Sequence, residues 1–285
     1  MKQTDTILDR IMVAVRREVA EAKSHRPLAE LRRLGADAPP VRSLKAALLG
    51  GFGLIAEIKE RSPSQGPMRR ANVDAAPAAY ECSPLVRANS VLTNASHFGM
   101  SIERLRAVKL AGTKPVLRKD FIFDDYQVHE ARAFGADAIL LMANLLEPAE
   151  QRRLFQLARE LGLEVLFEFH TVEEIGQAPV GAEIFGINSR TFSTTSAAYE
   201  SARAARAAGA QRDLTTDPGR FDLGAHLPRR AVKVAESGVA PATVRRLRDE
   251  LGYHAALVGT SLLLAEGGVT HELAAFERAL AGNHE

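Results

Sequence analysis

The chain contains a single cysteine, Cys82, among its 285 residues. One cysteine can form neither an intramolecular disulfide nor a thiolate metal cluster, so the fold must rest on its hydrophobic core. The excess of positive over negative charge is also small, because 37 lysines and arginines nearly balance 35 aspartates and glutamates. The resulting net charge of +2 gives no support to a nucleic-acid-binding role.

Long apolar runs are missing as well. The most apolar stretch, 138–146, is interrupted by Asn144 and is too short to span a bilayer. The first 23 residues carry charges throughout and lack the apolar centre of a secretory signal. We therefore expect a cytoplasmic protein without membrane contact, and a reducing compartment suits its single thiol.

Short apolar runs alternate with amphipathic helical patterns along most of the chain. Eight runs are of this kind: 54–58, 90–93, 115–117, 138–142, 164–169, 184–188, 232–235 and 255–258. Five of the seven intervals between their first residues are 20 to 26 residues, close to the length of one βα unit. Helical patterns lie between them, for example at 101–110, 148–161 and 241–251. Eight strands in strict alternation with helices predict a closed (β/α)₈ TIM barrel, an α/β fold.

The N-terminal segment does not follow this rhythm. Ile7, Ile11, Val15 and Val19 recur at four-residue spacing and predict a helix over the first 25 residues. A second, short helix is expected over 41–49. We interpret 1–48 as a helical extension packed on the barrel, and 49–285 as the catalytic barrel domain.

The interval between the sixth and seventh runs is unusually long. The alanine-rich segment 196–209 is expected to be helical. The polar segment 211–229, with two prolines and two glycines, is interpreted as an inserted and mobile loop.

Charged and polar residues stand at the ends of the apolar runs. In barrels of this kind the reacting groups lie at the carboxyl ends of the strands. The candidates are Glu57, Lys59, Lys119, Asp120, Glu168, Asn188, Arg190, Glu236 and Ser237. Any one such pair could simply lock the rim of the barrel, since structural ion pairs are also common. The whole set at one mouth favours catalysis, because unpaired buried charge is costly.

Small residues follow the last two runs. Ser237-Gly238 and Gly259-Thr260 would let backbone N–H groups approach a phosphate, although plain turns have the same composition. The hydroxyl-rich segment 62–66 after the first run could contact an anion or form an ordinary loop.

Several strings give the chain a family resemblance. They are IAEIKERSPSQG (55–66), SVLTNASHFGMS (90–101), PVLRKDFIFDDYQVHEARAFGADAILL (115–141), GLEVLFEF (162–169), FGINSR (185–190), VAESGV (234–239) and LVGTSLL (257–263). In these strings the chain resembles the indole-3-glycerol phosphate synthases. The resemblance implies closure of an indole ring, with decarboxylation and dehydration of 1-(2-carboxyphenylamino)-1-deoxyribulose 5-phosphate, in tryptophan biosynthesis. It implies no metal and no organic cofactor.

The resemblance also assigns roles. Lys119 matches the general acid, and Lys59 matches the lysine that holds the substrate carboxylate and assists dehydration. Glu168 matches the acid/base of later steps, Glu57 orients the lysines, and Asn188 binds substrate hydroxyls or the aniline region. The remaining substrate contacts implied are Ser62, Phe98, Phe121, Leu140, Arg190, Glu236, Ser237, Gly238, Leu257, Gly259 and Thr260.

The sequence departs from the family pattern at Asn89, Met100, Thr191, Phe192 and Thr260, and in the long sixth interval. These departures leave two alternatives open. One is a related phosphate-binding barrel lyase or isomerase of a specialised pathway, and the other is a non-catalytic binding protein. The expected partner is a small phosphorylated substrate, and the expected state is a monomer or weak homodimer.

Overall fold

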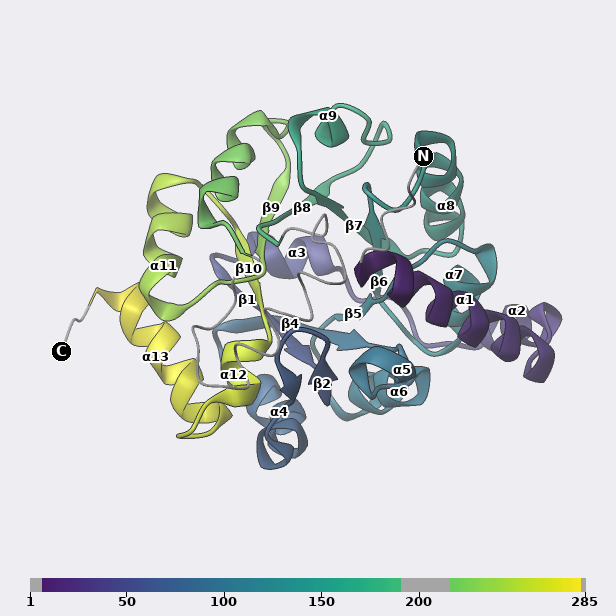
Figure 1. Ribbon diagram of the computed structural model, residues 1–285, viewed down its shortest axis with the longest axis horizontal. Coiled ribbons are helices and arrows are strands. Elements are labelled where there is room, and N and C mark those ends of the chain that lie inside the picture. Colours follow the sequence, from purple (N-terminus) through teal and green to yellow (C-terminus); the bar gives the residue numbers. More distant parts are fainter. Residues whose placement is uncertain (1–6, 191–215, 283–285) are drawn as a thin grey trace.

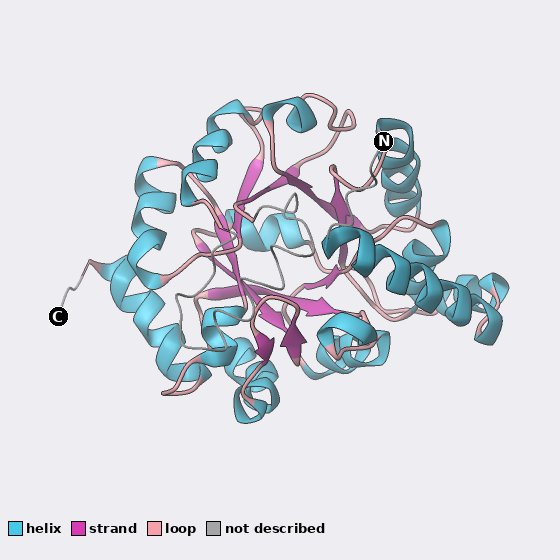
Figure 2. Cartoon of the chain, viewed as in Figure 1, coloured by secondary structure: helices cyan, strands magenta, loops and turns pink. Residues whose placement is uncertain are grey.

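Eight parallel strands close on themselves to form a barrel, and helices surround it (Figures 1 and 2). The structure, a computed structural model, describes residues 7–190 and 216–282. Around the barrel the order is β1-β10-β9-β8-β7-β6-β5-β4. The strands are β1 (Gly53–Ile58), β4 (Val86–Leu92), β5 (Val116–Lys119), β6 (Ala138–Met142), β7 (Glu164–Phe169), β8 (Ile184–Asn188), β9 (Val232–Glu236) and β10 (Ala255–Val258). All eight predicted runs are strands, which confirms the predicted fold.

The helices of the barrel fill the intervals between strands. They are α4 (Arg70–Cys82), α5 (Ala95–Phe98), α6 (Ile102–Ala111), α7 (Asp125–Ala133), α8 (Pro148–Glu160), α9 (Val172–Ile175), α11 (Pro241–Arg245), the π-helical η2 (Arg246–Glu250), α12 (Thr260–Leu264) and α13 (Val269–Ala281). Because helices enclose the sheet, β1, β6, β8 and β10 are buried along their whole length. None of the described helices is long and apolar enough to cross a membrane.

Strand register decides which side chains face the barrel interior. Glu57 pairs with Ser90, Met142 with Glu168, and Asn188 with Glu236. Side chains alternate between the two faces of a strand, and paired neighbours share a face. Following the pairs around the barrel places one set of side chains on the same inner face: Glu57, Ser90, Leu117, Lys119, Leu140, Glu168, Asn188, Glu236 and Leu257.

The N-terminal extension reaches both ends of the barrel. It forms α1 (Ile7–His25), α2 (Leu28–Ala36) and α3 (Leu44–Leu49), and three positions of the predicted α1 stripe, Ile11, Val15 and Val19, are buried. The side chain of Ile7 lies outside the described residues. At the carboxyl end of the barrel, the Glu18 carboxylate accepts hydrogen bonds from the backbone N–H groups of Ala95 (3.2 Å) and Ser96 (2.9 Å), at the start of α5. At the opposite end, the Lys45 backbone N–H donates to Glu164 (2.7 Å), the first residue of β7.

A short helix occupies part of the segment predicted to be a loop. Residues 218–226 form the 3-10 helix η1 (Pro218–His226), so that part of the prediction was wrong. Phe221 of this helix is buried and packs edge-on against the ring of Tyr253, whose hydroxyl donates to the Phe221 carbonyl (2.7 Å). The sequence signal was weak because the helix contains two large apolar residues, Phe221 and Leu223, which are too few to form a helical pattern. The predicted helix at 196–209, Thr191 and Phe192 lie outside the described residues.

The strand β4 begins four residues earlier than the sequence pattern predicted. Arg87 and Asn89 concealed its first half, since polar residues are uncommon in barrel strands. The Arg87 guanidinium donates to the Gly50 carbonyl (3.2 Å) at the edge of the barrel. Asn89 is buried, and its side-chain Oδ1 has no hydrogen-bond partner within the described part of the chain.

A buried ion pair fastens the extension to the amino end of the barrel. Asp137, which precedes β6, is fully buried and accepts from Nζ of Lys109 (2.5 Å). It also accepts from the backbone N–H groups of Arg42 (2.6 Å) and Val116 (2.7 Å). The carboxylate therefore joins the extension, the helix α6 and two strands at one point.

We predict that Asp137→Ala strongly destabilises the protein. Lys109 is almost fully buried and would lose its counterion, which typically costs about 3–5 kcal/mol. The free energy of unfolding measured in urea should fall by that amount. Asp74→Ala is the matched control, because the Arg70–Asp74 pair on α4 is exposed and should contribute little. Equal effects of the two substitutions would contradict the prediction.

Candidate active site

A cavity of about 500 Å³ opens at the carboxyl ends of the barrel strands. Its lining includes eleven residues that bear on the chemistry of the site: Glu57, Lys59, Gln65, Lys119, Arg190, Glu236, Ser237, Gly238, Leu257, Gly259 and Thr260. Ten of these, all except Gln65, are residues predicted from the sequence. Lys59 directly follows β1 and Lys119 ends β5, so the two lysines are distant in sequence, yet both border this one cavity.

Lys59 is held by its neighbour on β1. Its Nζ lies 2.6 Å from Oε1 of Glu57, and both side chains are buried. Burial opposes ionisation of Glu57, but the positive charges of Lys59 and Lys119 outweigh it and lower the pKa of this carboxyl. The Glu57 carboxyl is therefore ionised at neutral pH.

Lys119 lies among carboxylates on the inner face of the barrel. Its Nζ is 3.3 Å from Oε2 of Glu168 and 3.8 Å from Oε2 of Glu236. Burial would lower the pKa of Lys119, but the negative charges around it, Glu168 first, raise the pKa above its ordinary value. The ammonium group is thus fully protonated at neutral pH.

The two glutamates beside Lys119 differ in their ionisation. Burial raises the pKa of Glu168, but the positive charge of Lys119 outweighs that effect, so the pKa of this carboxyl is lowered. Burial and the negative charge of Glu168 both raise the pKa of Glu236 well above its ordinary value. A pair of close carboxyl groups avoids two negative charges in this way, and the proton resides on Glu236.

Two glycines make room for the side chains of Glu57 and Glu236. A Cβ on Gly259 would lie 2.6 Å from Oε1 of Glu57, closer than any real carbon contact. A Cβ on Gly186 of β8 would overlap Oε1 of Glu236. At both positions the missing side chain leaves space for a functional group.

The turn after β9 has an uncommon backbone conformation. Ser237 has φ of 68° and is the only described non-glycine residue with positive φ, and Gly238 follows at 66°. Such strain costs about 1–3 kcal/mol and concentrates at functional sites.

A hydrogen bond also joins two loops at the cavity. Nη1 of Arg190 donates to Oγ of Ser64 (3.1 Å), which ties the segment after β8 to the loop after β1.

Some predicted residues lie outside this cavity. Phe98 and Phe121 stack on one another with ring centroids 6.3 Å apart. Ser62 is buried, and its hydroxyl accepts from the Gln65 backbone N–H (3.0 Å). The other residues that do not border the cavity are Leu140, Glu168 and Asn188, which face the barrel interior by register. Direct substrate contact by all six remains a prediction.

The family model for indole-3-glycerol phosphate synthase matches residues 8–273. The chain belongs to the indole-3-glycerol phosphate synthase family. The synthase of Saccharopolyspora erythraea is 37% identical over 281 residues, which cover 98% of this chain and 97% of that protein. The synthase of a Nocardioides species is 41% identical over 261 residues, covering 90% and 93%.

Solved structures with low sequence identity share the fold of this synthase family member. The N-(5'-phosphoribosyl)anthranilate isomerase of Pyrococcus furiosus has a TM-score of 0.53 at 12% identity, covering 81% of this chain and 100% of that chain. The thiamine phosphate pyrophosphorylase of the same organism has a TM-score of 0.55 at 14% identity, covering 84% and 98%. At these identities the likeness concerns the barrel alone.

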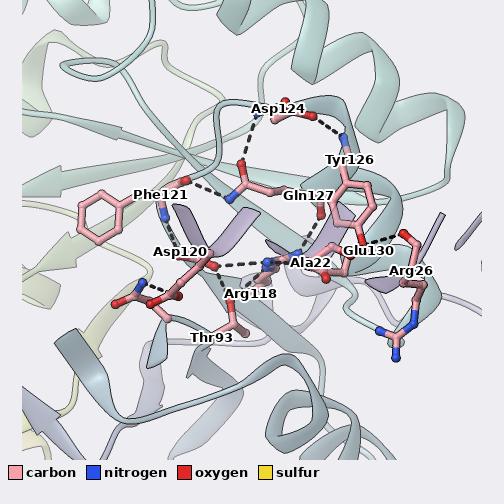
Figure 3. A network of polar contacts seen from close by, with 12 residues as sticks. Ala22, Arg26, Thr93, Arg118, Asp120, Phe121, Asp124, Tyr126, Gln127 and Glu130 are labelled. Carbon is pink, nitrogen blue, oxygen red and sulfur yellow. Dashed lines mark hydrogen bonds and ion pairs between the residues drawn. The ribbon is translucent and has the colours of Figure 1, made fainter. Parts of the chain in front are cut away.

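Sequence reasoning missed a buried network that supports the loop after β5 (Figure 3). The Arg118 guanidinium, next to Lys119, lies 3.2 Å from Asp120 and 2.8 Å from Glu130. The Thr93 hydroxyl donates to the same Asp120 carboxylate. Gln127 of α7 donates to the Phe121 carbonyl (3.0 Å), so both ends of the loop are fixed. The charged residues on either side of Lys119 were evident in the sequence. The sequence did not show that their side chains point outward, away from the barrel interior.

We predict that Glu236→Gln stabilises the protein at high pH. In the unfolded chain Glu236 ionises near its ordinary pKa of about 4.3, whereas in the fold its pKa is raised. The wild type therefore loses stability as the pH rises above that ordinary value, and the amide cannot ionise. The Tm difference between variant and wild type should be close to zero at pH 4 and positive at pH 8.

The exposed Glu173→Gln on α9 is the control for the loss of one carboxylate. Its Tm should follow the wild type at both pH values. A Glu236→Gln Tm below that of the wild type at pH 8 would contradict the raised pKa.

Proposed function

We propose that this protein converts 1-(2-carboxyphenylamino)-1-deoxyribulose 5-phosphate into indole-3-glycerol phosphate, carbon dioxide and water. The observation that carries the proposal is the convergence of Lys59 and Lys119 on one cavity, each beside a buried carboxylate. Membership of the synthase family supports the same reaction.

Lys119 is proposed as the general acid of ring closure. The aromatic carbon that carries the carboxylate attacks the ribulose carbonyl carbon, and the carbonyl oxygen takes a proton from Nζ. The lysine is protonated because its pKa is raised, and the developing alkoxide is far more basic than an amine. The buried charge also stabilises that oxygen as the negative charge forms.

Lys59 is proposed to hold the substrate carboxylate and to assist the loss of water. Its link to Glu57 (2.6 Å) fixes the ammonium at the edge of the cavity. Loss of carbon dioxide leaves its bonding electrons in the ring, which restores aromaticity and neutralises the iminium nitrogen. The hydroxyl then leaves with a proton as water, and Lys59 is placed to supply that proton.

Glu168 is proposed as the base of the last step. The carbon next to nitrogen must lose a proton to give the indole double bond, and an ionised carboxylate can accept it. The lowered pKa of Glu168 supports this role. Asn188 pairs in register with Glu236 on the inner face of the barrel, and its amide is proposed to hydrogen-bond the substrate hydroxyls or aniline region.

The rest of the cavity is proposed to bind the two ends of the substrate. The phosphate would lie at Ser62, Arg190, Ser237, Gly238, Gly259 and Thr260, where small residues and a guanidinium meet. The aromatic ring would pack on Phe98, Phe121, Leu140 and Leu257. All these residues belong to one chain, so we propose a monomer or weak homodimer that acts on a small phosphorylated molecule and not on nucleic acid.

We predict turnover without added metal. Purified protein in the presence of EDTA should convert the carboxyphenylamino deoxyribulose phosphate into a product with indole fluorescence. The resemblance implies this independence, and the lysines can supply the positive charge that a metal would otherwise provide. Absence of signal at micromolar enzyme, together with tight binding of the reduced substrate analogue, would favour the non-catalytic alternative.

We predict that Lys119→Met abolishes most turnover while the protein stays folded. Methionine keeps the length of the side chain but removes the proton and the charge, so kcat should fall by about 10²- to 10⁴-fold. Far-UV circular dichroism should be unchanged. Lys45→Met at the opposite end of the barrel is the control and should keep wild-type kcat. Near-normal turnover by Lys119→Met would remove the general-acid assignment.

A further inference from the structure

A buried histidine, His170, lies next to the proposed base Glu168. His170 follows β7 by one residue, and its Nε2 is 3.7 Å from Oε1 of Glu168. The other carboxylate oxygen, Oε2, faces Lys119 at 3.3 Å. The ammonium group of Lys119 therefore lies next to one oxygen of the Glu168 carboxylate, and the imidazole of His170 lies next to the other.

A second carboxylate holds the far side of the imidazole. Oε2 of Glu174, on α9, lies 3.6 Å from Nδ1 of His170 and accepts the His170 backbone N–H at 2.6 Å. Thr171 caps the same short helix, its hydroxyl accepting the Glu174 backbone N–H at 3.2 Å. The turn from β7 into α9 thus fixes the order of three titratable groups.

Exposure increases along this series. The exposed fraction of the side chain is 0% for Glu168, 6% for His170 and 20% for Glu174. A base that is completely buried can take a proton from the substrate only once, unless a neighbour then removes that proton. The next groups along the series are two side chains that exchange protons, and the last of them reaches solvent.

We propose that His170 and Glu174 form a proton relay that restores Glu168 between turnovers. This inference rests on the proposed function, because it takes Glu168 as the base of the last step. His170 is a positioning and relay residue here, since it touches Glu168 and not the substrate cavity.

Each bond formed along the relay replaces a bond broken, and Lys119 and Lys59, which each give a proton to the substrate, regain theirs from water. The O–H bond formed on Glu168 breaks as an N–H bond forms at Nε2 of His170. The N–H bond at Nδ1 breaks as an O–H bond forms on Glu174, which then releases the proton to water. Histidine suits the middle position because its two nitrogens accept and donate on opposite sides near neutral pH.

The two gaps are longer than hydrogen bonds, so a small rotation of the ring or a bridging water must close each one. Catalytic contacts are commonly long before the substrate binds. Other charged groups near the relay have separate partners. On η1, which packs against α9, Arg220 donates to the Arg190 carbonyl (3.3 Å) and Asp222 binds Arg246 (2.7 Å). Lys119 and Glu236 lie on the cavity side of Glu168.

The test compares His170→Gln and Glu174→Gln with wild type in single-turnover experiments, so that product release does not hide the step. His170→Gln should slow the single-turnover rate by about 10- to 100-fold, whereas the affinity for the reduced substrate analogue should stay within about threefold, since the ring lies outside the cavity. Glu174→Gln should give a smaller loss. In His170→Ala, added imidazole should restore part of the rate, which a purely structural role would not allow.

The matched controls are His129→Gln, a buried histidine on α7, and the exposed Glu173→Gln next to Glu174. Both should keep the wild-type rate. A His170→Gln rate within about twofold of wild type, or a loss that imidazole does not reverse, would overturn the relay. If the His170 variants do not fold, Glu174→Gln decides alone, and an unchanged rate and pH profile would count against the proposal.

A substrate-free measurement separates this inference from the proposed function. The NMR shifts of the His170 ring nitrogens should change in Glu168→Gln, while those of His129 should not. If the wild type fails to turn over but this coupling is present, the proposed reaction is wrong and the contact remains. If the wild type is active and the coupling is absent, only the relay is wrong.

Discussion

The alternation of side chains along paired strands is the constraint on which this site depends. Glu57, Lys119, Glu168 and Glu236 come from four strands, yet the register of the closed barrel places all four on its inner face. A slip of one residue in any strand would turn its functional group outward, under the helices. The chemistry at the mouth of the barrel therefore depends on the register of the hydrogen-bonded strands as much as on the residue types.

Charge balance then sets the chemical character of each group. The negative charge of Glu168 helps to keep Lys119 protonated, and burial together with that same charge keeps the proton on Glu236. Glu57 and Lys59, whose side chains lie 2.6 Å apart, form a separate ion pair at the same cavity. The cluster is thus one coupled electrostatic unit, in which the protonation of each member depends on the others.

The sequence allowed the barrel and most of the cavity to be predicted, for a physical reason. Strands such as β6 and β10 are continuous apolar runs, and the polar residue that ends a run marks the reactive edge. The prediction failed at η1, where the few large apolar residues, such as Phe221, form no helical pattern in the sequence. It also failed at the start of β4, where polar residues such as Arg87 interrupt the apolar run of the strand. His170 lies two residues after Glu168 and so had the right spacing, but its partner Glu174 depends on how α9 turns back.

The contacts at the two ends of the extension explain why residues 7–48 are integral to the structure. Glu18 fixes the start of α5 near the mouth, while Arg42 and Lys45 are fastened to the opposite end of the barrel.

Gly186 and Gly259 show a different kind of contribution to the site. They bear no reactive group, yet any substituent there would displace Glu236 or Glu57. The two positions therefore contribute to the site through the side chain that they lack, and a search for functional residues by reactivity alone would overlook them.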